Sequence, residues 1–220
     1  RPTNVEEFAE GNADLTARLC DFIADTGRKI PLVVASSIQA ELTNPYGQSK
    51  RAAEEYTEQL AGRTGNPVTI YRLPNVFGKW CRPNYNSVVA TFCHNLANDL
   101  PIQINDPTAQ LSLVYVDDVV ADFLAALAAD LPGVRRARVQ PEYTIRLGDL
   151  ADQIRAFRNC RTSLLAERVG TGLVRALYAS YVSYLPQASF AYDLPRHADE
   201  RGVFVEMLKT DQIDVVMGVM

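Results

Sequence analysis

The chain has 220 residues, of which 47% are hydrophobic and 22% are charged, and its formal net charge is −4. This composition is typical of a globular protein with one sizeable core and excludes a disordered or fibrous chain. The slight acidic excess gives no electrostatic footprint for nucleic acid or for an anionic membrane, so we expect neither partner. No apolar run reaches the roughly 18 residues that a membrane-spanning helix needs, and we expect a cytoplasmic protein.

The two ends of the chain indicate that it is part of a longer one. It opens on Arg1-Pro2 without an initiator methionine, and it closes on Gly218-Val219-Met220 directly after an apolar run. We therefore expect a fragment that is truncated at both ends.

Residues that commonly bind metals are sparse. The four cysteines are scattered without a C-x-x-C pair, and the two histidines, His94 and His197, are far apart in the sequence. This pattern favours neither a zinc site nor a disulfide framework. We expect free, buried or half-buried thiols and no metal within the chain.

Helical and extended patterns alternate in the first part of the chain. Helical spacing of apolar residues predicts a helix over residues 5–26, and the apolar run 31–35 predicts a strand buried on both faces. Helical spacing returns over residues 46–62, and the β-branched run 68–72 predicts a second buried strand. Strand, helix and strand at this spacing form a βαβ unit. The predicted fold class is α/β, with a Rossmann-like, doubly wound parallel sheet.

The later part of the chain continues with mixed elements. Residues 143–150 predict a short strand that is followed by a helix over 151–157. Apolar residues at helical spacing predict another helix over 173–185. Residues 201–209 alternate loosely, which predicts a strand.

Tyr46 and Lys50 lie one helical turn apart at the start of a predicted helix. Residues four apart share a helix face, so the Lys50 ammonium would favour the ionised form of the Tyr46 phenol. A phenol with a pKa of about 10 is a poor acid or base at neutral pH, and a nearby cation brings that pKa toward the working range. Chance would produce roughly 0.2 such spacings in this chain, so an exposed helix start with a solvated lysine is the alternative.

Polar residues follow both predicted strands of the βαβ unit. Ser36-Ser37 ends the first strand, and Pro74-Asn75 follows the second. Ligands of open α/β sheets bind outside the carboxyl ends of parallel strands. Because Tyr46 begins the helix after the first strand, these cues converge on one crevice.

The same segments resemble a known family, the extended short-chain dehydrogenase/reductases, also called the NAD-dependent epimerase/dehydratase family. Its members act on nucleotide sugars with a nicotinamide cofactor. In that family a strand ends in serines or threonines, a Tyr-x-x-x-Lys helix follows, and the next strand closes with Arg-x-x-Asn-Val-Phe/Tyr-Gly. The matching segments here are residues 35–37, 46–50 and 72–78, and residues 113–120 match a late strand and helix start of the family.

The resemblance implies a catalytic role for the first matching residues. Ser37 would hold the substrate oxygen, with Ser36 as the alternative, and Tyr46 would exchange a proton with that oxygen. Lys50 would assist Tyr46 and hydrogen-bond the nicotinamide ribose, so both Tyr46 and Lys50 would contact the cofactor.

Further matching residues would bind the cofactor and the substrate. Pro74 and Val76 match backbone positions that line the nicotinamide, and Asn75 matches a residue that reaches the diphosphate of the sugar nucleotide. For Pro74 and Val76, a turn that merely ends the strand is the alternative.

The segment after the second strand matches the substrate loop of the family. Asn86 would contact the nucleotide of the substrate. Leu111 stands where many members have an arginine for the diphosphate, so Lys79 or Arg82 would supply that charge. Trp80 is expected to pack rather than to bind.

Three segments, residues 36–47, 77–87 and 199–202, resemble one subgroup in particular, the capsular-polysaccharide reductases of the CapF type. The resemblance covers essentially the whole chain. It implies that residues 1–195 form a partial extended dehydrogenase/reductase domain with its substrate-binding portion, and that residues 196–220 begin a C-terminal cupin domain.

The resemblance also implies a reaction. It is the NADPH-dependent reduction of the 4-keto group of a UDP-N-acetyl-dideoxyhexose-4-ulose, toward a capsule precursor such as UDP-N-acetyl-L-fucosamine, by a homodimer. NAD stays open as the cofactor, because the glycine-rich turn and the residue that selects between NAD and NADP are expected upstream of Arg1. Any zinc ligands of the cupin are expected beyond Met220.

Two other activities remain as alternatives, a nucleotide-sugar 4-epimerase of the same family and a non-catalytic regulator with the same fold. A 4,6-dehydratase is disfavoured, because Ile38-Gln39 stands where those enzymes have the Asp-Glu pair that performs the elimination.

Overall fold

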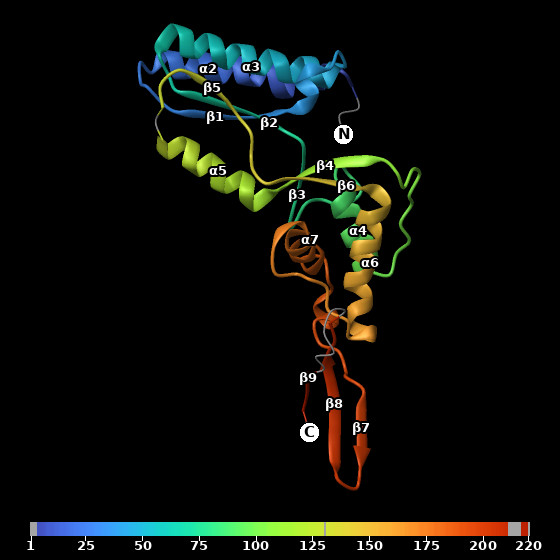
Figure 1. Ribbon diagram of the computed structural model, residues 1–220. Coiled ribbons are helices and arrows are strands. Elements are labelled where there is room, and N and C mark those ends of the chain that lie inside the picture. The colour runs from blue at the N-terminus through green and yellow to red at the C-terminus, as the bar shows by residue number, and fades with distance from the viewer. Residues whose placement is uncertain (1–3, 130, 211–216, 220) are drawn as a thin grey trace. The chain divides into compact units, whose positions relative to one another are not determined.

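A computed structural model describes residues 4–129, 131–210 and 217–219 of the chain (Figure 1). Within the described residues, the contacts group the chain into two compact units. The first lies within Arg1–Val76 and Val114–Glu142, and the second within Phe77–Leu113 and Tyr143–Met220. Each unit buries its own set of apolar side chains.

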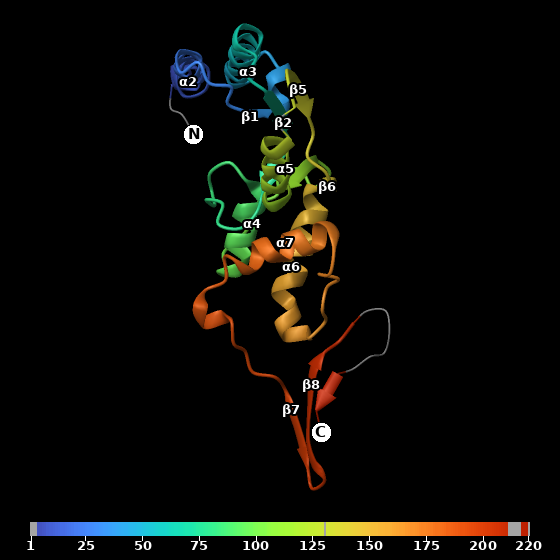
Figure 2. The same ribbon diagram turned by 90° about the vertical axis from the view of Figure 1, so that its left-hand side faces the viewer.

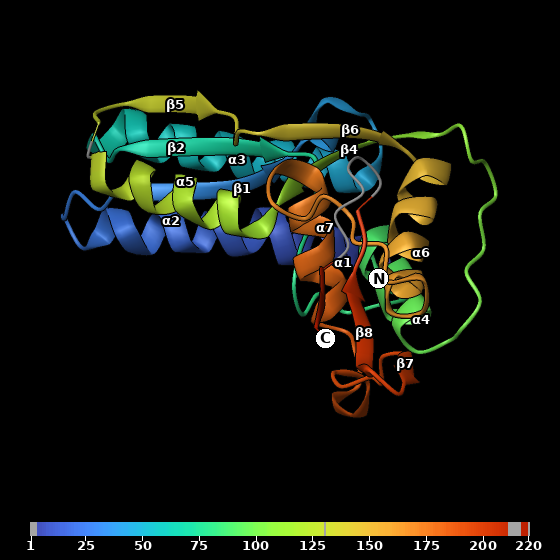
Figure 3. The same ribbon diagram turned by 60° about the horizontal axis from the view of Figure 1, so that its bottom comes forward.

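A parallel three-stranded sheet forms the middle of the first unit (Figure 3). Its strands are, in spatial order, β1 (Leu32–Ser37), β2 (Val68–Leu73) and β5 (Val134–Ala137). β2 is central and almost entirely buried, as its continuous apolar run predicts. The register pairs Ser36 with Arg72 and Ser37 with Leu73, so the predicted strand ends lie side by side. The predicted parallel βαβ unit is confirmed.

Helices cover both faces of this sheet (Figures 1 and 2). α3 (Pro45–Thr64) lies on one face with α2 (Leu15–Asp25) beside it, and α5 (Val116–Ala129) lies on the opposite face. Before α2 the chain forms α1 (Glu6–Phe8) and a π-helical segment, Ala9–Asp14. The helix predicted over residues 5–26 is therefore present, with an irregular first half.

α3 contacts the sheet through a face that is partly polar. Its buried residues include Ser49, Glu54 and Thr57 as well as the apolar Ala53 and Leu60. The small and polar side chains near its start let the helix approach the sheet closely, and the apolar ones pack farther along.

The second unit contains three helices and contributes to two further sheets. The helices are α4 (Val88–Ala97), α6 (Leu147–Ser163) and α7 (Gly172–Val182). One sheet has the order β3 (Asn75–Phe77), β4 (Gln110–Tyr115) and β6 (Glu142–Arg146). The other is antiparallel, with β7 (Arg196–Asp199), β8 (Gly202–Leu208) and β9 (Met217–Val219), as Figure 2 shows.

The later sequence predictions match these elements. β4 runs into α5 near residues 113–120, β6 runs into α6 near residues 143–157, and α7 overlaps the helix predicted over 173–185. β8 is the strand predicted over 201–209. The assignment of residues 196–220 to a cupin domain, separate from residues 1–195, stays a prediction.

In the described part of the chain, no helix combines the length and the apolar character that crossing a membrane requires. The four cysteines are free thiols: Cys20 and Cys93 are buried, and Cys81 and Cys160 are half-buried. This agrees with the expectation from their spacing.

One buried carboxylate joins α3 to all three strands of the first sheet. Glu54 is 1% exposed and accepts hydrogen bonds from Ser36 on β1, Arg72 on β2 and Arg136 on β5. Burial by itself would raise the pKa of Glu54. The hydrogen bonds from Arg72, Ser36 and Arg136 lower the pKa by more than burial raises it, so the pKa of Glu54 lies below its ordinary value.

We expect acid to destabilise the first unit through Glu54. Because the folded-state pKa lies below the unfolded-state value of about 4.3, the carboxylate stabilises the fold fully above that pH. This stabilisation is lost as the pH falls through the folded-state pKa. The free energy of unfolding, measured with urea, should fall more between about pH 7 and about pH 3 in the wild type than in Glu54→Gln.

Glu55→Gln is the matched control, because Glu55 is the next residue on α3 and is exposed. It should keep the wild-type pH dependence. Equal acid sensitivity of the wild type and Glu54→Gln would show that the Glu54 carboxylate does not contribute in this way.

Candidate active site

The hydroxyl groups of the two serines at the end of β1 make different hydrogen bonds. Successive strand residues point to opposite faces of a sheet. The Ser36 hydroxyl donates to Oε1 of Glu54 at 2.5 Å, on the side of α3. Ser37 precedes a short 3-10 helix, η2 (Ile38–Glu41), and its hydroxyl oxygen accepts the backbone N–H of Gln39 at 3.2 Å. Among the described residues, the Ser37 hydroxyl has no acceptor for its own proton, whereas that of Ser36 is engaged.

α3 begins close to this strand end because its first turn carries a glycine. Asn44 caps the helix by accepting the backbone N–H of Gly47 at 2.7 Å, and Pro45 takes the first helical position. A Cβ atom on Gly47 would lie 2.1 Å from the backbone oxygen of Gln39, so any larger residue would push the helix away from η2. The adjacent Tyr46 is thereby held near the end of β1.

Tyr46 and Lys50 share one face of α3, as the sequence predicts. Nζ of Lys50 lies 5.9 Å from the centroid of the Tyr46 ring and donates to the backbone oxygen of Ala35 at 3.3 Å. The Tyr46 ring also packs edge-on against Phe8, with their centroids 5.6 Å apart. Burial lowers the pKa of the Lys50 ammonium. A partly desolvated cation therefore lies beside the phenol ring and next to the end of β1.

These residues fit the ribose of a nicotinamide cofactor. Lys50 uses one N–H for Ala35, and its other N–H groups have no acceptor in the described part of the chain, which leaves them for sugar hydroxyls. Pro74 is half-buried directly after β2. Val76, in β3, packs its side chain against the core of the first unit. Asn75, between them, is exposed.

The other predicted substrate residues belong to the second unit. Nζ of Lys79 lies 5.7 Å from the centroid of the Trp80 ring, and the Arg82 guanidinium lies 5.5 Å from that of Tyr85. Asn86 is exposed in the same segment. Their position relative to the proton-transfer residues stays a prediction.

The prediction that Trp80 packs in the protein is wrong. Trp80 is 82% exposed and lies in a turn, where its backbone φ is +62°. The turn directs the indole outward, beside Lys79, instead of into a core.

Sequence reasoning missed Glu54, which is the most buried charged residue among those that the structure describes in the first unit. Arg72 could have indicated it, since an arginine inside a strand predicted to be buried needs a carboxylate partner. Glu54 lies one helical turn after Lys50 and meets Arg72 through Oε2 and Nη2 at 2.6 Å.

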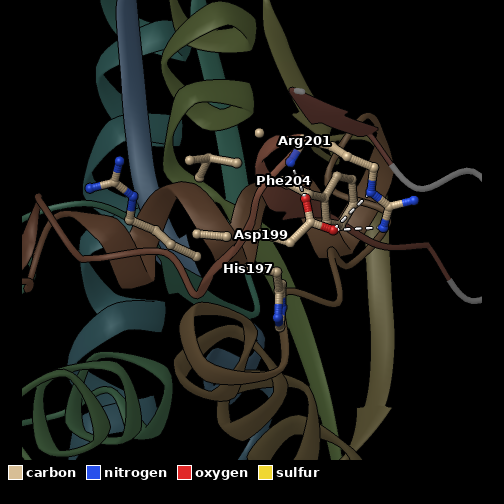
Figure 4. A pocket seen from close by; sticks show the side chains of 8 residues that line it. His197, Asp199, Arg201 and Phe204 are labelled. Atoms are coloured by element: carbon tan, nitrogen blue, oxygen red, sulfur yellow. Dashed lines mark hydrogen bonds and ion pairs between the residues drawn. The ribbon is translucent and has the colours of Figure 1, made fainter.

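A hollow of about 770 Å³ lies along the β7–β8 hairpin of the second unit (Figure 4). Its lining residues are all exposed. Asp199 accepts the backbone N–H of Arg201 at 2.8 Å and its Nη2 at 2.6 Å, and the His197 and Phe204 rings stack across the two strands. These contacts hold the hairpin together, and we assign them no catalytic role.

No three His, Cys, Asp or Glu side chains gather into a set that could hold a metal ion in the ranges that the structure describes.

Comparison with known proteins places the chain in a family. The model of the NAD dependent epimerase/dehydratase family matches residues 2–140. The UDP-2-acetamido-2,6-beta-L-arabino-hexul-4-ose reductase of Pseudomonas aeruginosa strain PA103 is 56% identical over 210 residues, which cover 96% of this chain and 56% of that protein. The chain thus spans about half the length of this relative.

The chain is also similar to solved structures. The capsular polysaccharide assembling protein CapF of Staphylococcus aureus superposes with a TM-score of 0.83 at 39% identity, covering 89% of this chain and 53% of CapF. A UDP-glucose 4-epimerase of Thermotoga maritima, solved with UDP-glucose, has a TM-score of 0.67 at 20% identity, covering 80% of this chain and 70% of the epimerase. The epimerase supports the fold alone.

The family match covers more than half of the chain, and it includes β1, β2 and the start of α3 with Tyr46 and Lys50. The CapF-type resemblance of the sequence agrees with the CapF structure. This chain belongs to the NAD dependent epimerase/dehydratase family.

Proposed function

We propose that the protein containing this chain uses NADPH to reduce the 4-keto group of a UDP-N-acetyl-dideoxyhexose-4-ulose. The product would be a capsular polysaccharide precursor, UDP-N-acetyl-L-fucosamine or a close analogue. The observation that carries the proposal is the arrangement of Ser37, Tyr46 and Lys50 at the end of one strand and the start of the following helix. The similarity to a hexul-4-ose reductase supports the reaction type.

The side chains of the first unit suit carbonyl reduction. A bound reduced nicotinamide would supply the hydride to C4 of the sugar. Tyr46 would donate its phenolic proton to the ketone oxygen, and the Ser37 hydroxyl would hydrogen-bond the same oxygen. The Lys50 ammonium would compensate the negative charge left on the phenolate, and the ketone would thereby become a secondary alcohol.

The cofactor would lie against Tyr46, Lys50, Pro74 and Val76, with Lys50 on the ribose hydroxyls. NADPH is the proposed donor, and NAD is the alternative. These four residues do not distinguish NADPH from NADH, because the phosphate on the ribose is recognised by other residues. Parallel assays with NADPH and NADH would therefore decide between the two cofactors.

Several residues would bind parts of the substrate other than the reacting carbon C4. Ser37 would bind O4, and Asn75 the diphosphate. Lys79 and Arg82 would supply positive charge for the phosphates, as guanidinium and ammonium groups commonly do. Asn86 would contact the uridine. We place the reaction in the cytoplasm, where nucleotide sugars would be available.

A nucleotide-sugar 4-epimerase is the second candidate, because it would use the same serine, tyrosine and lysine. The structural likeness to a UDP-glucose 4-epimerase keeps it open at the level of the fold. The two differ in cofactor use: a reductase oxidises one NADPH per product, whereas an epimerase regenerates its cofactor. A non-catalytic regulator would do neither.

Replacing Tyr46 by Phe should abolish the reductase activity of the full-length protein. Loss of the proton donor should lower kcat by about 100-fold to 10,000-fold, because general acid catalysis contributes on that scale. The assay follows NADPH absorbance with a UDP-4-keto sugar. Tyr56→Phe is the control, since Tyr56 lies on the same helix and is 37% exposed.

Unchanged activity in Tyr46→Phe would contradict the enzyme hypothesis. Epimerised product without net NADPH oxidation would instead identify the epimerase.

We further propose that the protein is a homodimer. In the first unit, α2 leaves Leu19 51% and Phe22 68% exposed, and large apolar side chains of this kind favour an assembly that covers them. Two-fold dimers are the commonest assembly of soluble proteins. Sedimentation equilibrium of the full-length protein should give twice the subunit mass, and a concentration-independent monomer mass would contradict the proposal.

A further inference from the structure

α3 is tied to β1 at two neighbouring points. Tyr46, Lys50 and Glu54 follow one another at intervals of four residues, so they lie along one face of the helix. Lys50 donates to the backbone oxygen of Ala35 at 3.3 Å, and Glu54 accepts the hydroxyl of Ser36 at 2.5 Å. These two strand residues come immediately before the predicted catalytic serine.

We propose that Glu54 is a positioning residue for proton transfer. Its carboxylate, held by the Ser36 hydroxyl, sets the separation and the rotation of α3 against the end of β1, and with them the approach of Tyr46 to the oxygen that Ser37 binds. This inference rests on the proposed function of Ser37 and Tyr46 and adds a requirement to it.

The carboxylate is constrained on both of its oxygens. Oε1 accepts from Ser36 at 2.5 Å and from Nε of Arg72 at 2.9 Å, and Oε2 accepts from Nη2 of Arg72 at 2.6 Å and from Nη1 of Arg136 at 3.1 Å. The guanidinium of Arg72 is a planar fork, so a two-point contact with it fixes orientation as well as distance. The carboxylate therefore cannot rotate or slide without breaking a hydrogen bond.

Arg72 extends the same constraint to the segment between serine and tyrosine. Its Nη1 pairs with Glu41 at 3.1 Å, and Glu41 ends η2, which begins directly after Ser37. Ser36 and Arg72 are also register partners on β1 and β2. Strand end, η2 and helix are thus connected through one guanidinium and one carboxylate.

Apolar packing is less directional than these hydrogen bonds. In α3, the core contacts of Leu60 and Ala61 lie near the carboxyl end of the helix, about four turns beyond Tyr46. Apolar burial is non-directional, whereas hydrogen bonds weaken steeply with misalignment. Glu54 lies between those contacts and Tyr46, and its directional bonds act on the first half of the helix together with those that Arg51 donates to the backbone oxygens of Ala40 and Leu42.

Glu54 acts through other residues and not on the substrate. It is 1% exposed, and both of its oxygens are occupied by donors from the sheet. A group in this position has no route to a reacting atom, so the expected effect of its removal is on the geometry of Tyr46.

Ser36→Ala and Glu54→Gln test the inference in the full-length protein. Ser36→Ala removes only the hydrogen bond between Ser36 and Glu54 and keeps the Lys50–Ala35 bond and both arginine contacts, so it should fold. We expect each variant to lower kcat for 4-keto sugar reduction by about 10-fold to 100-fold, because displacements of about 1 Å have effects of that size. KM should stay within about twofold of the wild type, since substrate binding is not altered.

Glu58→Gln is the matched control. Glu58 lies one turn further along α3, and among the described residues its carboxylate pairs with Arg136 at 2.5 Å and not with β1. It should keep the wild-type kcat. An equal loss of kcat in Glu58→Gln would show that any charge loss on α3 has this effect, and would overturn the inference.

Amide hydrogen exchange over residues 45–51 provides a readout that needs no activity. We expect faster exchange there in Ser36→Ala and Glu54→Gln, with wild-type exchange in Glu58→Gln. Unchanged exchange and unchanged kcat in Ser36→Ala would overturn the inference. If the wild type lacks reductase activity, the proposed function is wrong, and the exchange data alone then decide whether Glu54 holds the start of α3.

Discussion

The arrangement of the first unit depends on the hydrogen bonds that the buried Glu54 carboxylate accepts. A buried charge is tolerated only when donors surround it, and breaking one such pair typically costs about 3–5 kcal/mol. Here the donors come from all three strands of the sheet, through Ser36, Arg72 and Arg136. Satisfying this one group therefore requires the sheet and the helix to be in their final register.

Two backbone features bring Tyr46 to the end of β1. Gly47 allows α3 to start against η2, where any Cβ atom would meet the backbone oxygen of Gln39. The two-residue period of a strand turns Ser36 toward the helix and leaves Ser37 for the opposite side. A slip of one residue along β1 would exchange the two serines between these two sides.

Local patterns explain why so much of the fold was predictable. The apolar run of β2 is recognisable within a few neighbouring residues, and the strand was found in place. The exposed Trp80 was not predictable, because the turn that directs it outward depends on a positive φ and not on hydrophobicity. Glu54 was missed for a different reason: its partners Arg72 and Arg136 are 18 and 82 residues away.

The sequence by itself determined the α/β class, the parallel βαβ unit and the placement of Tyr46 and Lys50 on one helix face, because periodicity and helical spacing are local properties. The tertiary structure decided which of the two serine hydroxyls donates to a carboxylate and which, among the described residues, has no acceptor, and which charged residue is buried between α3 and the sheet. Both depend on pairing between distant segments, and a hydrogen bond between such segments exists only after the strands and the helix have packed together.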